Sequence, residues 1–432
     1  MLGTIIYLVV FLLLVNAAGF FGLKILFPKK KRAIHFSRLV YWGADLLFVV
    51  FSIIWLVLIR SADMPVHELY RKHFYIAGVF VPIYISKAVF ASFYVLHQLK
   101  NLLAVITSGV ITRPQGISKA ILVCRKSRWI LRVGLVVALL IFVLVLHGIF
   151  IGRHQFEVVK HELWFNDLPH SFDGYRIVHF SDTHLGSFAN PEHVEKGLGL
   201  INELDADAIM FTGDLINNHI NETVPYVQLF YGLRARDGKF SVLGNHDMGD
   251  YRRWATIEEQ KHCLGELEIF YKQTGFTLLR NASHVVHRGS DSIVVAGVDN
   301  WGLPPFSQEG DLGEALDKIR PGMFKLLLSH DPSHWRAEVI PKTSVQLTLS
   351  GHTHGMQFGM LNRFVQWSPA SWIYAEWQGL YREGQQKIYV NRGFGFLSFP
   401  GRVGVSPEIT LLILRSSHNK QEDLPLIQLH HD

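Results

Sequence analysis

Acidic, amide and imidazole side chains recur in five short clusters in the second half of the chain, and nearly every cluster follows an apolar run. The clusters are Asp182-Thr183-His184, Gly213-Asp214, Gly244-Asn245-His246-Asp247, His330 and Gly351-His352-Thr353-His354. Carboxylate, imidazole and amide oxygen groups are ligands for divalent ions such as Mn, Fe and Zn. Gathered in one place without a cation, they would repel or desolvate one another. The pattern therefore predicts metal-dependent chemistry rather than core packing.

The apolar runs before the clusters are rich in Val, Ile, Leu and Phe, which predicts β-strands. These runs are Arg176–Phe180, Ala208–Phe211, Phe240–Leu243, Phe324–Leu328 and Val345–Leu349. A buried strand that ends in a loop places its last polar residue at the rim of a sheet. We therefore expect the five strand ends to converge on one small volume.

Helical patterns alternate with these strands, which is typical of an α/β domain. They cover Pro191–Leu204, Asn221–Leu233, Thr256–Thr274 and Asp311–Ile319, and an opening strand and turn are expected over Gln155–Leu168. The chain shows no internal repeat and no low-complexity segment.

The ordered motifs D-x-H, G-D, G-N-H-D, H and G-H-x-H resemble those of the calcineurin-like metallophosphoesterase superfamily. The stretch Tyr389-Val390-Asn391-Arg392-Gly393-Phe394-Gly395, followed by Pro407-Glu408-Ile409-Thr410, resembles the membrane-associated bacterial branch typified by YkuE and YaeI. The likeness covers roughly Glu157–Leu414. It implies a four-layer α/β/β/α sandwich and a metal-dependent phosphoric ester hydrolase.

Carried over to this chain, the resemblance implies a dinuclear centre. One metal would be held by Asp182, His184 and His354, the other by Asn245, His330 and His352, with Asp214 as the bridge. Two divalent ions about 3.5–4 Å apart can share a hydroxide and clamp a phosphoryl group. His246 is then left as a catalytic non-ligand that neutralises charge or protonates the leaving oxygen, and Asp247 is expected to orient its ring.

The chain contains 23 histidines, so a single histidine carries little information. We expect structural roles for His284, His287 and His334. The pair His430-His431 is expected to lie in a solvated tail.

The whole chain is apolar in composition, with 49% hydrophobic residues and a mean hydropathy of +0.19. The excess of hydrophobic residues lies in the first third of the chain. Its apolar stretches are each near the ~20 residues that span a bilayer as a helix. They are Thr4–Leu23, Leu39–Leu58, Phe74–Leu96 and Trp129–Ile151. The first lacks a basic start and an evident cleavage site, so we expect a retained helix rather than a signal peptide. The predicted organisation is a transmembrane domain over residues 1–151, a catalytic domain over 152–416 and a tail over 417–432.

Two residues complicate the third stretch, because Pro82 and Lys87 lie within it. An intramembrane lysine is a candidate functional site. The interpretation that we favour is a lysine that faces the helix bundle or reaches toward the interface.

Basic residues are concentrated in the first and third connections between the apolar stretches. These residues are Lys24, Lys29, Lys30, Lys31, Arg32 and Arg38, and then Lys100, Arg113, Lys119, Arg125, Lys126 and Arg128. The second connection mixes basic Arg60, Arg71 and Lys72 with acidic Asp63 and Glu68. The positive-inside rule therefore places both termini and the catalytic domain outside the cytoplasm.

The net charge of +6 and the pI near 9.1 arise largely from these connections. They favour anionic lipid head groups, and no nucleic-acid partner is expected. The two cysteines, Cys124 and Cys263, fall on opposite faces of the membrane in this topology, so no disulfide is expected.

Aromatic residues crowd the segment after the last metal motif, Gly355–Gln386. They are Trp367, Trp372, Tyr374, Trp377 and Tyr381, and Phe394, Phe396, Leu397 and Phe399 follow between glycines. Such a stretch beside a catalytic centre favours a lipid-facing rim or a substrate wall. Ordinary core packing is an equal alternative.

The ligands alone do not choose between a phosphomonoester, a phosphodiester and a pyrophosphate. The Ser/Thr protein phosphatases of the superfamily carry G-D-x-x-D-R-G, whose arginine clamps a monoester dianion. This chain instead reads Gly213-Asp214-Leu215-Ile216-Asn217-Asn218-His219. Without that fork-shaped donor a bidentate phosphate contact is missing, which argues against phosphoprotein substrates.

Only Gly152–Phe156 separates the last apolar stretch from the first predicted strand, so the active site must lie close to the bilayer. We therefore expect cleavage of a phosphodiester or pyrophosphate in a lipid-linked molecule, such as a phospholipid, a lipid A or nucleotide-lipid precursor, or a polyprenyl-linked intermediate. A phosphatase of soluble small-molecule phosphates and a non-catalytic membrane receptor or scaffold are the alternatives. The intact motifs weigh against the scaffold, and the sequence does not determine the oligomeric state.

Overall fold

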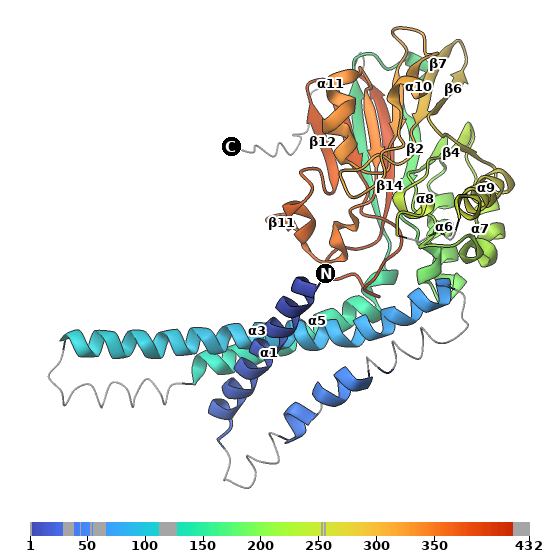
Figure 1. Cartoon of the computed structure of the whole chain (residues 1–432). Coiled ribbons are helices and arrows are strands. Elements are labelled where there is room, and N and C mark those ends of the chain that lie inside the picture. The colour runs from blue at the N-terminus through green and yellow to red at the C-terminus, as the bar shows by residue number, and fades with distance from the viewer. Residues whose placement is uncertain are drawn as a thin grey trace. The chain divides into compact units, whose positions relative to one another are not determined.

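The structure is a computed structural model that describes residues 2–28, 39–43, 45–51, 54, 66–111, 128–251, 254 and 256–417. It contains two compact units (Figure 1). A helical unit comprises Met1–Pro65 and Lys72–Phe150, and a catalytic unit comprises Val66–Arg71 and Ile151–Asp432.

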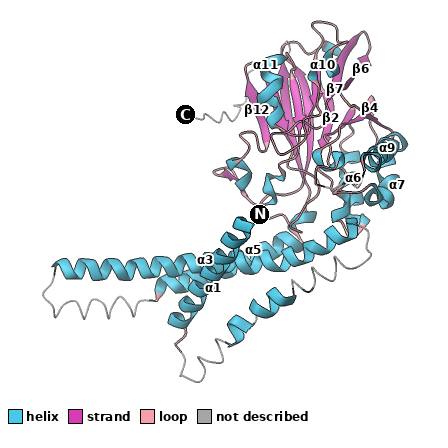
Figure 2. Ribbon diagram, in the orientation of Figure 1, coloured by secondary structure: helices cyan, strands magenta, loops and turns pink. Residues whose placement is uncertain are grey.

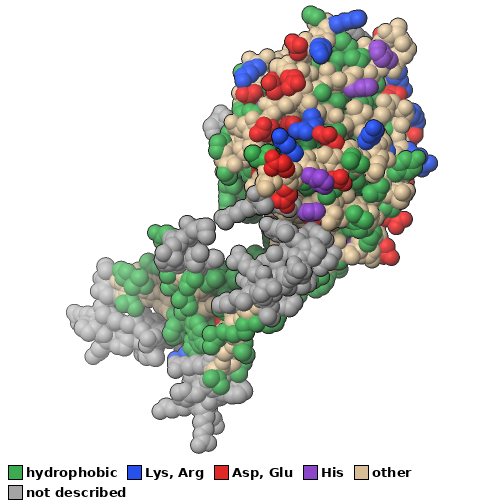
Figure 3. All heavy atoms as spheres, turned by 45° about the vertical axis from the view of Figure 1, so that its right-hand side comes forward, with side chains coloured by type: hydrophobic (Ala, Val, Ile, Leu, Met, Phe, Trp, Pro, Cys, Tyr) green, Lys and Arg blue, Asp and Glu red, His purple; other side chains and the backbone are tan. Residues whose placement is uncertain are grey.

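The helical unit contains α1 (Leu2–Leu26), α3 (Val66–Ile111) and α5 (Trp129–Phe150). Three described segments are long and apolar enough to cross a membrane: Val9–Leu26, Phe74–Thr107 and Trp129–His154. Their surface is largely hydrophobic, whereas the visible face of the catalytic unit mixes charged and apolar side chains (Figure 3). A bilayer accounts for that surface, because single-span apolar helices expose such side chains to lipid.

The expected spans differ from the described helices in two places. Of the second stretch, Leu39–Leu58, a shorter apolar helix is described over Leu39–Phe51, and nearly all the remainder lies outside the described residues. The third stretch was predicted to end at Leu96, but α3 continues to Ile111 and includes Lys100, which the sequence places in a connection. His97, Gln98 and Lys100 do not interrupt a helix, because helices extend beyond the apolar layer wherever polar residues with adequate helix propensity follow.

Lys87 lies against the neighbouring helices of its own unit. Its Nζ donates to Oδ1 of Asn16 at 2.9 Å and pairs with the carboxylate of Asp45, beside which lies the hydroxyl of Tyr84. Burying a charge in an apolar setting requires such partners. The lysine therefore faces the helix bundle, which is the favoured interpretation of the sequence.

The catalytic unit is built on two six-stranded sheets. The first has the order β1-β14-β2-β3-β4-β5, with β1 Glu157–Phe165, β2 Tyr175–Phe180, β3 Ala208–Phe211, β4 Gly238–Ser241, β5 Phe276–Leu278 and β14 Glu408–Ser416. The second has the order β12-β13-β9-β8-β7-β6, with β6 Ala282–Arg288, β7 Asp291–Gly297, β8 Lys325–Leu328, β9 Leu347–Ser350, β12 Gly379–Glu383 and β13 Gln386–Val390. A small hairpin joins β10 (Met360–Leu361) to β11 (Gln366–Trp367).

The two sheets face one another across the main core, and helices cover their outer faces (Figure 2). Alternate residues of each strand point to opposite faces, so Ile177 of β2 packs between the sheets while Phe180 packs outward against Phe230. The outer face of the first sheet is covered by α6 (Pro191–Glu203), α7 (Val227–Tyr231) and α9 (Ile257–Gln273), and that of the second by α10 (Leu312–Leu316), η5 (Trp335–Val339) and α11 (Ile340–Lys342). The expected four-layer α/β/β/α sandwich is thus present.

Two of the predicted helices are shorter in the structure. Over Asn221–Leu233 a 3₁₀ segment, η4 (Ile220–Tyr226), precedes the short α7, because Pro225 has no N–H for an α-helical hydrogen bond. Over Asp311–Ile319 only the shorter α10 forms, with Asp311 as its N-cap and Leu316 as its last residue. The strand expected over Phe240–Leu243 begins and ends two residues earlier as β4.

Candidate metal centre

The polar residues that follow β2, β3, β4, β8 and β9 meet at one place because these strands run parallel within each sheet. β2, β3 and β4 are parallel neighbours in the first sheet, and β8 and β9 are parallel neighbours in the second. Their carboxyl ends lead directly into Asp182, Asp214, Asn245, His330 and His352. The convergence expected from the sequence is therefore realised across the gap between two sheets.

The backbone at these strand ends is held in an unusual conformation. Five of the predicted ligands have positive φ: Asp182 (55°), His184 (45°), Asp214 (56°), His352 (71°) and His354 (50°). L-residues rarely adopt this left-handed region, and such strain is concentrated at functional sites. The loops therefore fix side-chain direction at a cost in stability.

The motif glycines are explained by close packing among these loops. A Cβ on Gly244 would lie closer than 3.0 Å to the carboxylate of Asp214, and a Cβ on Gly351 would meet Ser181 and Asp182 equally closely. Only glycine allows the ligand-bearing loops to approach one another in this way.

The first group of candidate ligands is formed by Asp182, His184 and His354, all buried. Nε2 of His184 lies 3.0 Å from Nε2 of His354, which is 3.4 Å from Oδ1 of Asp182. Three donor atoms with lone pairs thus face a single point, which is the arrangement that a cation satisfies.

The second group is formed by Asn245, His330 and His352. Oδ1 of Asn245 lies 3.0 Å from Nε2 of His330 and 2.9 Å from Nδ1 of His352. The other ring nitrogen of His330, Nδ1, donates to the carbonyl oxygen of Thr212 at 2.7 Å. This hydrogen bond leaves Nε2 of His330 as the free ligand atom, as in protein sites where an outer partner sets the tautomer of a metal-bound histidine.

Asp214 stands between the two groups. Its Oδ2 is 3.6 Å from Nε2 of His184 and 3.3 Å from Nε2 of His330. Its Oδ1 accepts a hydrogen bond from the backbone N–H of His246 at 2.9 Å. One carboxylate oxygen therefore faces a histidine of each group.

The electrostatics of the site call for positive charge. Burial raises the pKa of Asp182 to about 7, with a further contribution from Asp214. Burial opposes charge on His330 as well, but the adjacent Asp214 raises the pKa of this ring to about 10. Although burial alone would raise it, His330 and His246 hold the pKa of Asp214 well below its usual range. A buried centre that draws protons to its ligands is suited to divalent cations, which satisfy the same groups.

His246 lies beside the first group, with its ring edge-on to that of His184 at 4.9 Å between centroids. Nδ1 of His246 is 2.6 Å from the carbonyl oxygen of Asn217, so this nitrogen donates and Nε2 is left available. Its other face stacks on Tyr251 at 4.3 Å. The main-chain carbonyl of Asn217 therefore orients the ring.

The structure corrects the prediction that Asp247 orients His246. The carboxylate of Asp247 accepts hydrogen bonds from the backbone N–H groups of Leu215, Ile216 and Gly244. These contacts join the Gly213 and Gly244 loops, and Nδ1 of His246 is bonded to the carbonyl oxygen of Asn217 instead. Asp247 thus holds the two loops in register, and burial raises its pKa to about 7.

Two residues near the centre were not assigned to it by sequence reasoning. The buried Arg402 contacts Nδ1 of His354 at 3.2 Å and donates to the carbonyl oxygens of Arg392 and Gly393, while the N–H of Gly395 donates to the carbonyl of Asp182. Burial lowers the pKa of Arg402 to about 9. The Asn391–Gly395 motif was a usable signal for this loop, but no motif marks Arg402.

The second is Tyr374, whose hydroxyl lies 2.8 Å from Nε2 of His352. The aromatic segment over Gly355–Gln386 therefore has mixed roles. Tyr374 belongs to the site wall, Trp377 is buried, and Trp367 and Trp372 are exposed.

The histidines expected to be structural lie away from the ligands. His334 is buried, with Nδ1 2.8 Å from the hydroxyl of Ser329 and its ring stacked on Trp301. His284 and His287 are exposed on β6, and His430-His431 lies outside the described residues. Cys263 is buried on α9, while Cys124 also falls outside the part of the chain that is described.

Comparison with known proteins assigns the family of this chain. Residues 175–356 match the family described as calcineurin-like phosphoesterase, and residues 2–153 match a probable calcineurin-like phosphoesterase transmembrane domain. The metallophosphoesterase YkuE of Bacillus subtilis is 33% identical over 279 residues, covering 62% of this chain and 89% of YkuE. The chain belongs to the calcineurin-like phosphoesterase family. It is a metallophosphoesterase and a membrane protein, as the motifs and apolar helices predict.

Two further relatives show the range of this phosphoesterase family. A transmembrane protein with metallophosphoesterase domain from Danio rerio is 27% identical over 282 residues, which cover 64% of this chain and 61% of that protein. The UDP-2,3-diacylglucosamine pyrophosphatase LpxG of Chlamydia trachomatis is 25% identical over 281 residues, which cover 53% of this chain and 81% of LpxG.

Proposed function

We propose that this metallophosphoesterase uses a dinuclear metal centre to hydrolyse a phosphodiester or pyrophosphate bond in a lipid-linked substrate on the extracytoplasmic side of the membrane. The observation that carries the dinuclear centre is the position of Asp214, whose Oδ2 faces His184 of one group and His330 of the other. Without a shared ligand, the two groups would be separate sites.

Asp182, His184 and His354 would hold one ion, Asn245, His330 and His352 the other, and Asp214 both. Two divalent ions held by these residues would supply an activated water and neutralise charge on the phosphoryl oxygens. The donor set, with its carboxylates, imidazoles and one amide oxygen, suits Mn, Fe or Zn.

His246 acts on the leaving group in this proposal. Because its Nδ1 donates to the carbonyl of Asn217, Nε2 is the atom that meets the substrate. Burial lowers the pKa of His246, whereas the neighbouring Asp214 favours the charged ring. A ring that gains a proton beside Asp214 and releases it to a leaving oxygen supplies general-acid catalysis, worth about 10²–10⁴-fold.

The loop after Asp214 supports a diester or pyrophosphate over a phosphoprotein. Asn217, Asn218 and His219 stand where the protein phosphatases of the superfamily carry their arginine motif. The backbone N–H groups of these residues are occupied by the carboxylate of Glu222. This loop offers no guanidinium to clamp a monoester dianion.

A lipid-linked substrate is supported by the short connection to the membrane. α5 ends at Phe150 and β1 begins at Glu157, so the connection reaches at most about 25 Å even when fully extended. The relative LpxG, named as a pyrophosphatase of a diacylated nucleotide sugar, is consistent with this class of substrate.

The test is an assay of the purified full chain, reconstituted with Mn, on three substrates. They are bis(p-nitrophenyl) phosphate, p-nitrophenyl phosphate and a lipid diphosphate presented in vesicles. We expect the diester and the lipid diphosphate to be cleaved and the Asp214→Ala variant to be inactive on both. Preference for the monoester would favour a small-molecule phosphatase, and equal rates for wild type and Asp214→Ala would leave a non-catalytic receptor or scaffold.

A further inference from the structure

Exposed apolar side chains of the described catalytic unit gather in one short segment, residues 356–373. The most exposed are Met360, Phe364, Val365, Trp367, Trp372 and Ile373, with 89% of Phe364 and 74% of Trp372 accessible. Elsewhere in this unit such residues occur singly, for example Val224 and Ile257. Single exposed apolar residues are ordinary, whereas a contiguous group marks a surface that meets another apolar phase.

The segment, which we call the apolar hairpin, has a defined structure. β10 pairs with β11, and Oδ1 of Asn362 accepts hydrogen bonds from the N–H groups of Phe364 and Val365. These bonds fix the turn that presents Phe364 at the tip. Trp367, the last residue of β11, packs edge to face against Trp372, with 5.6 Å between the ring centroids. The apolar residues are thus displayed on an ordered support.

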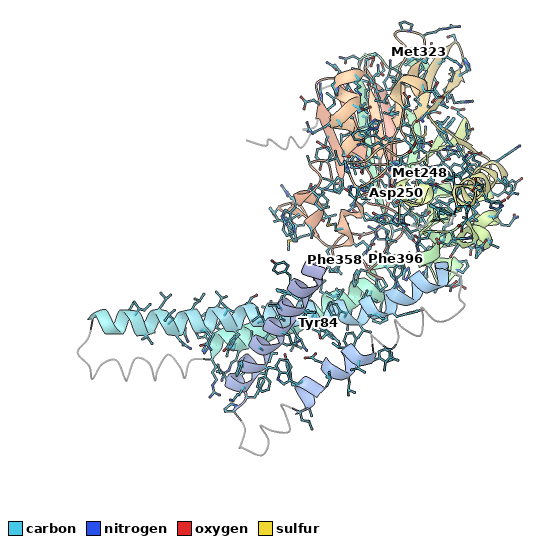
Figure 4. All side chains as sticks on the ribbon, in the orientation of Figure 1. Tyr84, Met248, Asp250, Met323, Phe358 and Phe396 are labelled. Atoms are coloured by element: carbon cyan, nitrogen blue, oxygen red, sulfur yellow. The ribbon has the colours of Figure 1, made fainter. Side chains whose placement is uncertain are left out.

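The base of the apolar hairpin is fastened to the loop Phe396–Val403. Nε2 of Gln357 donates to the carbonyl oxygens of Phe399 and Gly401, and the N–H of Gly359 donates to the carbonyl oxygen of Val403. The ring of Phe358 packs on Phe399 at 4.8 Å. Figure 4 shows Phe358 and Phe396 at the same end of the catalytic unit, opposite Met323.

The same loop holds the segment through which the chain arrives from α5. Nη1 of Arg153 donates to the carbonyl of Pro400 at 3.1 Å, and its guanidinium lies over the ring of Phe396 at 4.9 Å. Arg153 is three residues beyond Phe150, the last residue of α5. Within the catalytic unit, the apolar hairpin and the attachment to the last membrane helix therefore share one end.

The charge of the hairpin also matches a bilayer surface. Residues 356–375 contain no Asp or Glu, and Arg363 is exposed next to the tip. Anionic lipid head groups attract a basic residue and repel carboxylates, and tryptophan favours the membrane interface.

Both ends of the hairpin touch the metal centre. His354 precedes it by two residues, and Ile373 is followed by Tyr374, whose hydroxyl contacts His352. A lipid whose acyl chains lie beside the hairpin would therefore carry its head group toward the ligands.

We propose that residues 356–373 are a membrane-docking hairpin whose tip enters the boundary between the head groups and acyl chains of a bilayer. The occupant is the lipid bilayer to which the helical unit already belongs. The docking itself needs only the geometry above, while its catalytic consequence rests on the proposed function: docking brings the phosphate bonds of lipid-linked molecules to the centre.

The first experiment measures the depth of the tip in the full chain, reconstituted in nanodiscs of phosphatidylcholine and phosphatidylglycerol. In a Cys124→Ser, Cys263→Ala background, Phe364→Cys carries a nitroxide, and Val224→Cys, at a position 68% exposed on η4, is the matched control. We expect the label at 364 to collide mainly with dissolved oxygen and the label at 224 mainly with a water-soluble nickel chelate. Equal access of the chelate to both positions overturns the proposal.

The second experiment measures turnover with CDP-diacylglycerol in vesicles and with soluble bis(p-nitrophenyl) phosphate. Phe364→Asp with Trp372→Asp should lower the lipid rate at least about tenfold, because carboxylates resist entry into the interface, and leave the soluble rate within about twofold. Val224→Asp is the control and should change neither rate. A lipid rate that stays at the wild-type level overturns the docking. If the wild-type enzyme cleaves only the soluble ester, the proposal of a lipid-linked substrate is contradicted. The nitroxide measurement then tests the membrane docking of the hairpin by itself.

Discussion

At the scale of single residues, Asp214 differs from Asp182, the other carboxylate among the candidate ligands, in the side chains that its oxygens face. The carboxylate of Asp182 faces the ring of His354 and accepts hydrogen bonds from the backbone N–H of His352. Oδ2 of Asp214 instead faces two imidazole rings, those of His184 and His330, one from each group. The low pKa of Asp214 shows that it carries its negative charge where positive charge is gathered. The loss of this charge should therefore affect both groups at once.

Asp214→Asn preserves the volume of the side chain and removes its charge. We expect metal content to fall and turnover to drop more than about 100-fold, since changes in the outer partners of a metal ligand alone cost about 10–100-fold. Elemental analysis and turnover of bis(p-nitrophenyl) phosphate check this. Two metals retained with turnover within a few-fold of wild type would show that Asp214 is not the bridge.

His246→Ala should keep both metals, because the ring lies beside the ligands and is held by the carbonyl of Asn217. The rate should fall by about 10²–10⁴-fold on a substrate with a poor leaving group, and less on nitrophenyl esters, whose leaving oxygen needs little protonation. Comparing an alkyl diester with a nitrophenyl diester separates the two effects. Equal losses would remove the general-acid role, and loss of metal would make His246 a ligand.

The gathering of the candidate ligands could be predicted from the sequence because they follow the strands that position them. The role of Asp247 could not, since neighbours in a turn point in different directions and the hydrogen-bond partners of Asp247 come from another loop. Arg402 and Tyr374 were missed for a related reason. Their contacts with His354 and His352 depend on packing between distant segments, which leaves no local pattern.

At the scale of elements, the local sequence pattern predicts a strand when the strand is a continuous apolar run. It fails for a strand of mixed polarity that forms because a neighbouring strand pairs with it. β2, β3, β8 and β9 are buried on both faces, whereas β6 mixes polar and apolar residues and is largely exposed. β6 forms through its antiparallel register with β7, from Ala282↔Gly297 to Arg288↔Asp291. Such edge strands are specified by tertiary pairing more than by propensity.

The loop after β13 supports the ligands as an element, and Gly395 tests it. A Cβ at Gly395 would lie closer than 3.0 Å to the carbonyl oxygen of Thr183, between two ligands, so Gly395→Ala must displace backbone. We expect a loss of about 1–3 kcal/mol in the free energy of unfolding, with reduced metal content.

The matched control is Gly265→Ala on α9, where the added Cβ would meet no described atom within 4 Å apart from its chain neighbours and the backbone of its own helix. Alanine in the middle of a helix should stabilise it by about 0.5–1 kcal/mol. Thermal unfolding of the detergent-solubilised chain compares the two variants. If both changed the transition equally, the contact of the Gly395 loop with Thr183 would not restrain the centre.

At the scale of the whole molecule, the position of the catalytic unit relative to the membrane decides which substrates it can meet. The basic residues of the first and third connections favour a cytoplasmic location for those connections. Most of these residues lie outside the described part of the chain, so topology is a matter for direct labelling.

We expect Cys124 to be shielded from an impermeant thiol reagent in intact cells, and a Ser417→Cys variant to be labelled. Permeabilised cells, in which both positions should react, are the control. Labelling of Cys124 alone would place the catalytic unit in the cytoplasm and contradict an extracytoplasmic lipid-linked substrate.

The pairing of β1 with β14 has a consequence for biosynthesis. β1 lies at the edge of its sheet, and its neighbour in the order is β14, with Glu157 opposite Glu408. Ribosomes add about 5–20 residues per second, so roughly 12–50 s separate the synthesis of the two strands. During that interval β1 follows an inserted helix with no partner, which invites pairing with other chains. Charged side chains lie along β1, at Glu157, Lys160 and Glu162. They oppose such aggregation until β14 has been synthesised and pairs with β1.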